Sequence, residues 1–113
     1  MEQFSTIFKG LNDETRLKIM LLLNKQSYCV CQLSELLELS QPKISKHLSK
    51  LKDLNLVQTR RDAQYIFYEL NIHDVMVKDV IHTLSLAAHQ HPTYQKLLES
   101  TPTCVLSVCY DKK

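Results

Sequence analysis

Apolar residues recur every three or four positions through the first half of the chain, the spacing that places them on one face of an α-helix. This periodicity predicts four short helices before residue 55. They cover residues 3–11, closing near Gly10; residues 12–25, with Asn12 as the N-cap; residues 33–39; and residues 40–54, with Ser40 as the N-cap and Pro42 in the first turn. The third and fourth are adjacent and separated by a break, which is typical of a helix-turn-helix unit.

The apolar period changes to two after Asn55, where β-branched and aromatic residues become frequent. Residues 56–60 and 65–70 therefore predict a β-hairpin directly after the helix-turn-helix unit. A long closing helix is predicted over residues 71–91, and residues 93–100 can add one or two helical turns. Apolar side chains cover most of the circumference of the closing helix, so we expect it to form a subunit interface.

These elements define the expected fold class, which is mainly α with a small β-hairpin. In this order they describe a winged helix-turn-helix domain that is dimeric through its first and last helices. A length of 113 residues, with 44% hydrophobic and 23% charged residues, suits one globular domain. We expect residues 1–100 to form the DNA-binding and dimerisation domain and residues 101–113 to form a flexible tail that contains cysteine.

Basic residues are concentrated in the helix-turn-helix and hairpin region. Residues 40–61 hold six lysines and arginines against Asp53 alone, whereas the rest of the chain holds 8 basic and 11 acidic residues. A basic stripe on an otherwise acidic small protein is expected of a protein that contacts a nucleic-acid backbone. A solvated helix face is the alternative interpretation of the same charges.

The fourth predicted helix is the recognition helix of such a unit, and its first turns face base edges in the major groove. Glutamine can pair with adenine and lysine can reach guanine, so this helix can read bases, although it defines no single operator sequence. The expected partner is double-stranded operator DNA, pseudo-palindromic because it binds a homodimer. The expected DNA contacts are Gln41, Lys43, Ser45, Lys46 and His47 at the bases, and Lys50, Lys52, Arg60, Arg61 and Gln64 at the backbone.

The composition argues against membrane proteins and enzymes. The longest unbroken apolar run, residues 19–23, is far shorter than the ~20 residues of a membrane span, and the N-terminus lacks the layout of a signal peptide. We therefore expect a cytoplasmic protein that is not attached to a membrane. A single glycine cannot build a glycine-rich phosphate loop, and no nucleophile elbow is recognisable, so we expect no enzymatic activity.

Four cysteines are candidate metal ligands, because thiols stay reduced in the cytoplasm. Two of them form a C-x-C pair at the head of the helix that supports the recognition helix. Side chains at i and i+2 of a regular helix diverge by about 200°, so this pair can hold one ion only if the start of the helix is irregular or distorts. The alternative is that one or both are small buried apolar residues. The candidates are the C-x-C pair Cys29 and Cys31, and Cys104 and Cys109 of the tail.

Three blocks of the sequence resemble the ArsR/SmtB family of metalloid- and metal-sensing repressors, and within it the arsenical-resistance branch. The blocks are LNDETRLKIMLLL, CVCQLSELLELSQPKISKHLSKLKDLNLV and RRDAQYIFYEL, and the resemblance covers roughly residues 3–90. It implies a homodimer that represses resistance genes and leaves its operator when As(III) or Sb(III) is captured by cysteine thiolates. It also implies that Cys29 and Cys31 supply two of the ligands, and we expect no cofactor to be required for folding.

The chain departs from the family pattern at three places. Ser34 stands where some members have a third cysteine, so we expect Cys104 or Cys109, from either subunit, to supply the third thiolate. The usual T-x-S-H-H of the recognition helix is replaced here, which leaves the operator sequence open. Asp62 and Ala63 stand where the hairpin commonly has a glycine, which predicts a wider hairpin tip.

Other sensing functions remain open on the sequence alone. A thiol redox or reactive-sulfur sensor would oxidise the same cysteines, and a cadmium or lead sensor would bind those soft divalent ions with them. Zinc sensors of the family use acidic and histidine side chains on the closing helix. Asp79, His82, His89 and His91 lie in that region, but their spacing does not match the zinc pattern, so we expect them to be solvated surface residues.

Overall fold

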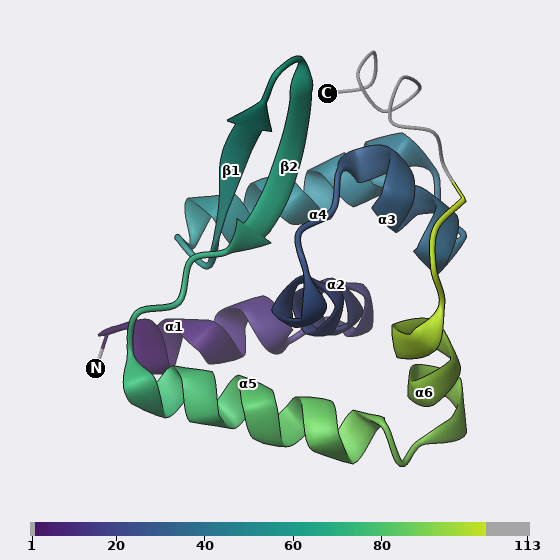
Figure 1. Cartoon of the computed structure of the whole chain (residues 1–113). Coiled ribbons are helices and arrows are strands. Elements are labelled where there is room, and N and C mark those ends of the chain that lie inside the picture. Colours follow the sequence, from purple (N-terminus) through teal and green to yellow (C-terminus); the bar gives the residue numbers. More distant parts are fainter. Residues whose placement is uncertain (1, 104–113) are drawn as a thin grey trace.

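The structure is a computed structural model that describes residues 2–103, which form six helices and one two-stranded hairpin (Figure 1). This order confirms the predicted fold class, a winged helix-turn-helix that is mainly α with one β-hairpin. None of these helices is long and apolar enough to cross a membrane. The helices are α1 (Glu2–Leu11), α2 (Glu14–Lys25), α3 (Val30–Leu37), α4 (Gln41–Asp53), α5 (Val75–Ala88) and α6 (Pro92–Glu99), and the strands are β1 (Val57–Asp62) and β2 (Tyr65–Leu70).

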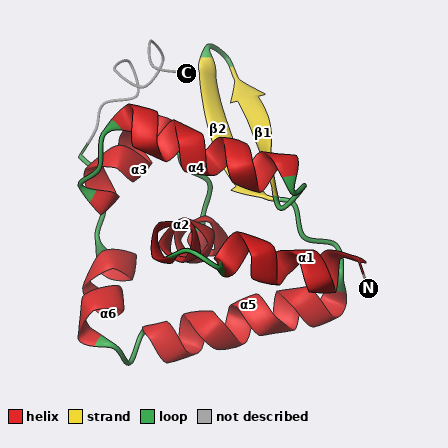
Figure 2. Cartoon of the chain, turned by 180° about the vertical axis from the view of Figure 1, so that it is seen from behind, coloured by secondary structure: helices red, strands yellow, loops and turns green. Residues whose placement is uncertain are grey.

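Helix α2 lies in the middle of the molecule. Helix α1 lies beside it and α5 lies below both, while the α3–α4 pair lies above it together with the β1–β2 hairpin, which we call the wing (Figures 1 and 2). Five consecutive residues of α2, Ile19–Leu23, are buried. A helix covered on one side only would alternate buried and exposed positions, so α2 is the central element on which the others pack.

Capping residues explain where the helices begin. Ser40 caps α4 as predicted, because its hydroxyl accepts the backbone N–H of Lys43 at 3.4 Å. The N-cap of α2 is Asp13 and not the predicted Asn12, and its carboxylate accepts the N–H of Arg16 at 3.1 Å. A carboxylate also interacts favourably with the positive end of the helix dipole, which a neutral amide does less well.

The single glycine of the chain serves packing and not helix termination. Helix α1 ends at Leu11, close to the predicted end, but Gly10 lies inside it and has no positive φ. A Cβ atom at Gly10 would lie 3.1 Å from Cδ2 of Leu51 and closer still to Leu56. The absence of a side chain therefore lets α1 approach the end of α4 and the start of the wing.

Three turns of the described residues use a non-glycine residue in the left-handed region, one of them at Asn55 after α4. Glu38, with φ 56°, ends α3, so Leu39 lies outside the helix that the sequence predicted over residues 33–39. Ala63, with φ 58°, lies at the tip of the wing. Asp62 pairs with Tyr65, so only two residues form the tip and the prediction of a wider tip is wrong.

Candidate functional site

Helix α4 buries one face and exposes the other, as a recognition helix requires. Ile44, Leu48 and Leu51 are completely buried and anchor α4 to the core. Figure 2 shows α4 along the outer edge of the molecule, at the end opposite α5. Gln41 is half-buried, and the exposed predicted DNA contacts of this helix are Lys43, Ser45, Lys46, Lys50 and Lys52.

His47 lies differently from its neighbours on α4. Its ring is half-buried, and its Nδ1 lies 4.0 Å from Oδ1 of Asp13, the N-cap of α2. The pKa of the Asp13 carboxyl is lowered mainly because it accepts the N–H of Arg16, and His47 and the Arg16 charge act in the same direction. His47 therefore joins the recognition helix to α2, and a base contact by its ring stays a prediction.

The predicted contacts on the wing are also exposed, but Arg60 is already engaged within the chain. Arg61 and Gln64 are exposed at the end of β1 and at the tip. The Nε of Arg60 donates to Oε1 of Glu69 at 3.2 Å, and its Nη2 donates to Oγ of Ser27 at 3.0 Å. Its guanidinium carbon lies 5.1 Å from the centroid of the Phe67 ring, within the range of a cation–π contact.

Cys29 and Cys31 are brought together in a small cluster that is separate from the main core. Their exposed fractions are 2% and 8%, and Phe67 of β2 packs against the cluster. Cys29 is the N-cap of α3 with extended backbone angles, φ −91° and ψ 169°, and its N–H donates to Oε1 of Gln32 at 3.1 Å. Only Cys31 lies inside the helix, so the irregular helix start that a shared ion requires is present.

The residue before this pair attaches it to the wing. The N–H of Tyr28 donates to the carbonyl oxygen of Tyr68 at 3.2 Å, and the N–H of Tyr68 donates back at 2.8 Å. The two residues form an isolated antiparallel bridge beside β2. Burial raises the pKa of both phenols, so both rings remain neutral at physiological pH. One isolated bridge therefore joins the residue before Cys29 to β2 of the wing.

The other two predicted ligands, Cys104 and Cys109, lie outside the described residues. The last described residue, Thr103, is attached to α3, because its N–H and its hydroxyl donate to Oε2 of Glu35 at 2.8 and 2.6 Å. Glu35 follows Cys31 by four residues, which is about one helical turn. Immediately before residue 104, the chain therefore returns to α3, the helix that begins at the cluster of Cys29 and Cys31, hereafter the thiol cluster.

Within residues 2–103, no three His, Cys, Asp or Glu side chains gather in a way that could hold a metal ion. Ser34, at the position of the third cysteine of some relatives, donates its hydroxyl to the carbonyl oxygen of Leu39 and so closes the turn of the helix-turn-helix. The side chains considered for zinc, Asp79, His82, His89 and His91, are exposed on or just after α5.

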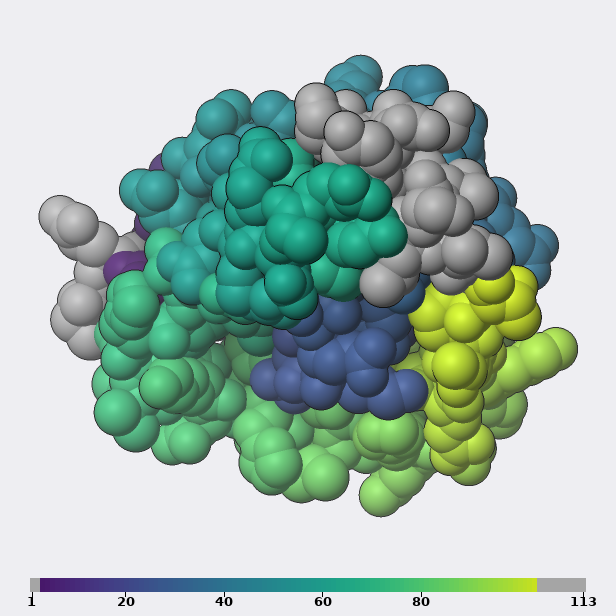
Figure 3. All heavy atoms as spheres, turned by 45° about the horizontal axis from the view of Figure 1, so that its top comes forward, coloured from purple at the N-terminus to yellow at the C-terminus, as the bar shows by residue number. Residues whose placement is uncertain are grey.

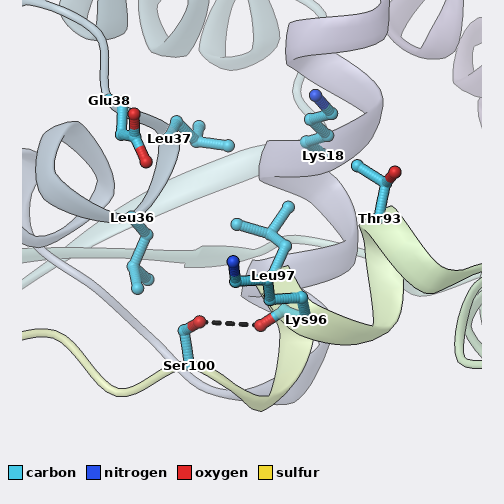
Figure 4. A pocket seen from close by; sticks show the side chains of 8 residues that line it. All are labelled: Lys18, Leu36, Leu37, Glu38, Thr93, Lys96, Leu97 and Ser100. Carbon is cyan, nitrogen blue, oxygen red and sulfur yellow. Dashed lines mark hydrogen bonds between the residues drawn. The ribbon is translucent and has the colours of Figure 1, made fainter.

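Two further surface features lie away from the cysteines. A pocket of about 250 Å³ lies between α2, α3 and α6, with Glu38 and Lys18 on opposite sides and leucines between them (Figure 4). It contains no thiol, so it offers no chemistry for a soft ion. Large apolar side chains are exposed on α1 and α5, which lie side by side, and exposed apolar surface of this kind marks a protein interface. They are Phe8, Val75, Met76 and Leu86.

Sequence reasoning missed Phe67 and Glu35. Both lie in correctly predicted elements, but their roles depend on partners far along the chain, Cys29 and Thr103. The alternation of β2 was the one available signal for Phe67, because it places this ring on the face opposite Tyr68, which packs on the main core.

Comparison with known proteins identifies relatives of this chain. The family described as "Bacterial regulatory protein, arsR family" matches residues 13–59. An arsenic resistance transcriptional regulator of Pseudomonas putida is 41% identical over 81 residues, which are 66% of this chain and 63% of that protein. The arsenical resistance operon repressor of Staphylococcus aureus is 39% identical over 85 residues, which are 75% of this chain and 80% of that protein. Among solved structures, reduced HlyU from Vibrio cholerae matches with a TM-score of 0.65 and 36% identity, over 78% of this chain and 86% of that chain.

Proposed function

Because the chain belongs to the arsR family of bacterial regulatory proteins, we propose that it represses transcription from an operator and is released by As(III) or Sb(III). Membership of this family confirms the predicted class, a DNA-binding transcriptional regulator. The observation that supports a metalloid inducer is the buried pair of cysteines at the start of α3, the helix that packs beside the recognition helix α4. Relatives described as arsenic and arsenical resistance regulators, at about 40% identity, support the same inducer.

The chemistry of the thiol cluster suits a trivalent metalloid. Thiolates are soft ligands, and arsenite bonds to them with loss of water. Each As–S bond forms as one S–H bond and one As–OH bond break, and the thiol proton leaves with the hydroxide as water. In the reduced protein Cys29 and Cys31 supply two such bonds. Because Cys29 is outside the helix and Cys31 inside it, closing both sulfur atoms on one arsenic atom acts on the first turn of α3.

Cys104 is the third thiolate in this proposal, supplied by the same subunit. Consecutive Cα atoms are about 3.8 Å apart, so residue 104 begins within one such step of Thr103. Because Thr103 is hydrogen-bonded to Glu35 on α3, that step starts close to the helix that carries Cys31. Cys109 lies five residues further on and has no comparable attachment point before it within the described residues.

The exposed cations of α4 and the wing supply the DNA-binding surface of the proposed repressor. The exposed apolar side chains of α1 and α5 supply the surface of a homodimer, which places two recognition helices on the two halves of a pseudo-palindromic operator. Such a repressor acts in the cytoplasm, where promoter DNA is located. Metalloid binding is coupled to DNA release by about 1 to 3 kcal/mol, which lowers operator affinity about 5- to 150-fold.

Fluorescence anisotropy on a labelled promoter duplex, selected by the protein from a random pool, tests this function. The reduced protein is kept in a phosphine reductant, which does not compete as a dithiol, and is titrated with and without sodium arsenite at fixed salt. We expect wild-type affinity to fall in arsenite and the Cys29→Ser and Cys31→Ser variants to keep theirs. Equal affinity of the wild type in both conditions, or full release of both variants by arsenite, contradicts the proposal.

A thiol redox or reactive-sulfur sensor is the second candidate, and the similarity to a structure described as reduced HlyU favours it. In that case peroxide or persulfide releases the DNA and arsenite has no effect. A cadmium or lead sensor differs again, because Cd(II) would give tight binding with charge-transfer absorbance in the ultraviolet. The same anisotropy assay with each additive separates the three ligands.

A further inference from the structure

A row of three residues crosses the wing and ends at the thiol cluster. In the register of the hairpin, Arg60 lies opposite Phe67. The antiparallel bridge between Tyr28 and Tyr68 puts Cys29 opposite Phe67 on its other side. Residues directly opposite one another share one face of a sheet, with Cβ atoms about 4.5 to 5.5 Å apart. We name these residues the Arg60–Phe67–Cys29 row.

Phe67 connects the other two members of this row, and Arg60 is also hydrogen-bonded to the segment that precedes Cys29. The Phe67 ring packs against the cluster of Cys29 and Cys31, and the guanidinium carbon of Arg60 lies 5.1 Å from the centroid of this ring. Arg60 also donates to Oγ of Ser27 at 3.0 Å, two residues before Cys29. In Figure 3 the spheres of the teal wing directly adjoin the dark blue segment that precedes α3. Arg60 is therefore positioned by the same segment that carries the thiols.

We propose that the Arg60–Phe67–Cys29 row transmits the state of the thiols to the DNA-facing wing, with Arg60 as a positioning residue. The inference rests on the proposed function. A closely packed interior has little free space, so a bound arsenic atom must displace the groups in contact with the sulfur atoms. Phe67 is the side chain that packs against the cluster of Cys29 and Cys31. When this ring shifts, the Arg60 guanidinium loses the surface on which it lies, and the wing loses one link to α3.

Arg61 provides a matched comparison, because successive side chains of a strand point to opposite faces. It is an exposed arginine next to Arg60, but it lies outside the row. Loss of a simple phosphate contact weakens DNA binding equally with and without inducer. Loss of a residue of the row instead changes the release ratio, defined as operator Kd with sodium arsenite divided by operator Kd without it.

The test measures the release ratio of the reduced full chain by anisotropy for wild type, Arg60→Gln, Phe67→Leu and Arg61→Gln. We expect Arg60→Gln and Phe67→Leu to lower the ratio by about two- to fivefold, the size of an exposed cation–π contact. Arg61→Gln should weaken binding in both conditions and keep the wild-type ratio. If the wild-type release ratio is above one and both Arg60→Gln and Phe67→Leu keep that ratio, this inference is overturned and the proposed function stands. A wild-type ratio of one overturns the proposed function and the inference with it.

Amide hydrogen exchange of the wild type gives a second measurement that does not depend on any variant folding well. The N–H of Tyr68 is bonded to the carbonyl of Tyr28 at 2.8 Å, so its protection reports the joint between the wing and the thiol segment. We expect sodium arsenite to speed its exchange, while protected amides of α2 keep their rates. Unchanged exchange at Tyr68 in a sample that has bound arsenite overturns the inference.

Discussion

The thiol cluster and the exposed face of α4 lie on the two helices of one helix-turn-helix unit, yet they are built in opposite ways. The cysteines are almost completely buried and packed against an aromatic ring. The lysines of α4 are exposed, and their helix is fixed by three buried apolar side chains on its other face. A buried site cannot accept a ligand without moving its neighbours, whereas an exposed cation can bind or lose a phosphate with little rearrangement.

In the proposed repressor, this difference separates DNA binding from the binding of the inducer. The exposed face supplies affinity that depends on the ionic strength of the solution. In this proposal the buried cluster supplies the response, because an ion bound there must displace the side chains packed around the cysteines. Tyr28 and Phe67 join the cysteine cluster to the wing, which belongs to neither helix.

The largest expected effect concerns salt and separates the two regions most clearly. With six cations at phosphates, the logarithmic slope of operator affinity against salt is about −5, so affinity falls roughly a thousandfold between about 50 and 200 mM. Arsenite binding to the free protein involves no phosphate and should change little over the same range. Anisotropy and a thiol-protection assay measure the two affinities.

The exposed residue Lys46 provides the control for this prediction. If its ammonium group binds one phosphate, Lys46→Gln should reduce the steepness of the slope by about 1 and should leave arsenite binding unchanged. An arsenite affinity that follows salt as steeply as operator affinity would show that the regions are not separate.

A smaller effect is expected at the attachment of Thr103 to α3. Glu35→Ala removes two hydrogen bonds to Thr103, and at about 1 kcal/mol it should weaken arsenite binding roughly fivefold, because Cys104 is then less well positioned. Counting the thiols that arsenite protects from alkylation measures the change: three in the wild type, and a weaker third in the variant.

Two comparisons make this test specific for Cys104. Glu38→Ala changes an exposed carboxylate near the end of the same helix and should have no effect on arsenite affinity. In a Cys104→Ser background, Glu35→Ala should cause no further loss. If Cys109→Ser and not Cys104→Ser removes the third protected thiol, the third ligand is assigned to the wrong cysteine.

The features predicted from the sequence are those that depend on spacing within one helix. The contacts that depend on the register between strands were missed. The Ser40 cap and the helix that it begins follow from spacing within one segment, and both were predicted. A four-residue loop at the wing tip would place Arg60 opposite Tyr65, whereas the two-residue loop places it opposite Phe67. The contact between Phe67 and Cys29 and the bond from Thr103 to Glu35 join residues 38 and 68 positions apart, and no local pattern encodes them.

A third prediction concerns Asp13, which links the recognition helix to α2. Its folded pKa is lowered, so its carboxylate stabilises the protein at pH values above its ordinary pKa of 3.8, and this contribution is lost as the pH falls through the lower folded value. Asp13→Ala should cost about 1 kcal/mol near pH 7, because α2 loses its N-cap, and much less near pH 2. Urea unfolding at both pH values measures the difference.

Asp13→Asn is the control for that experiment, because asparagine caps a helix well but carries no charge. It should lose only about 0.3 to 1 kcal/mol near pH 7, and its stability should depend less on acid pH than that of the wild type. A cost near pH 2 as large as that near pH 7 for Asp13→Ala would show that the carboxylate charge plays no part.

The smallest expected effect lies at the tip of the wing, the exposed part farthest from the thiols along β2. Ala63 has φ 58°, a conformation that costs an L-residue roughly 1 to 2 kcal/mol and costs glycine almost nothing. Glycine loses more entropy on folding, by about 0.5 to 1 kcal/mol, so Ala63→Gly should stabilise the protein by roughly 0.5 kcal/mol.

The same change at Ala87, which is exposed within α5, should instead destabilise the protein by about 1 kcal/mol. Because the tip does not touch the Arg60–Phe67–Cys29 row, Ala63→Gly should leave the release ratio at its wild-type value, and a changed ratio would mean that the response depends on the whole wing and not on that row.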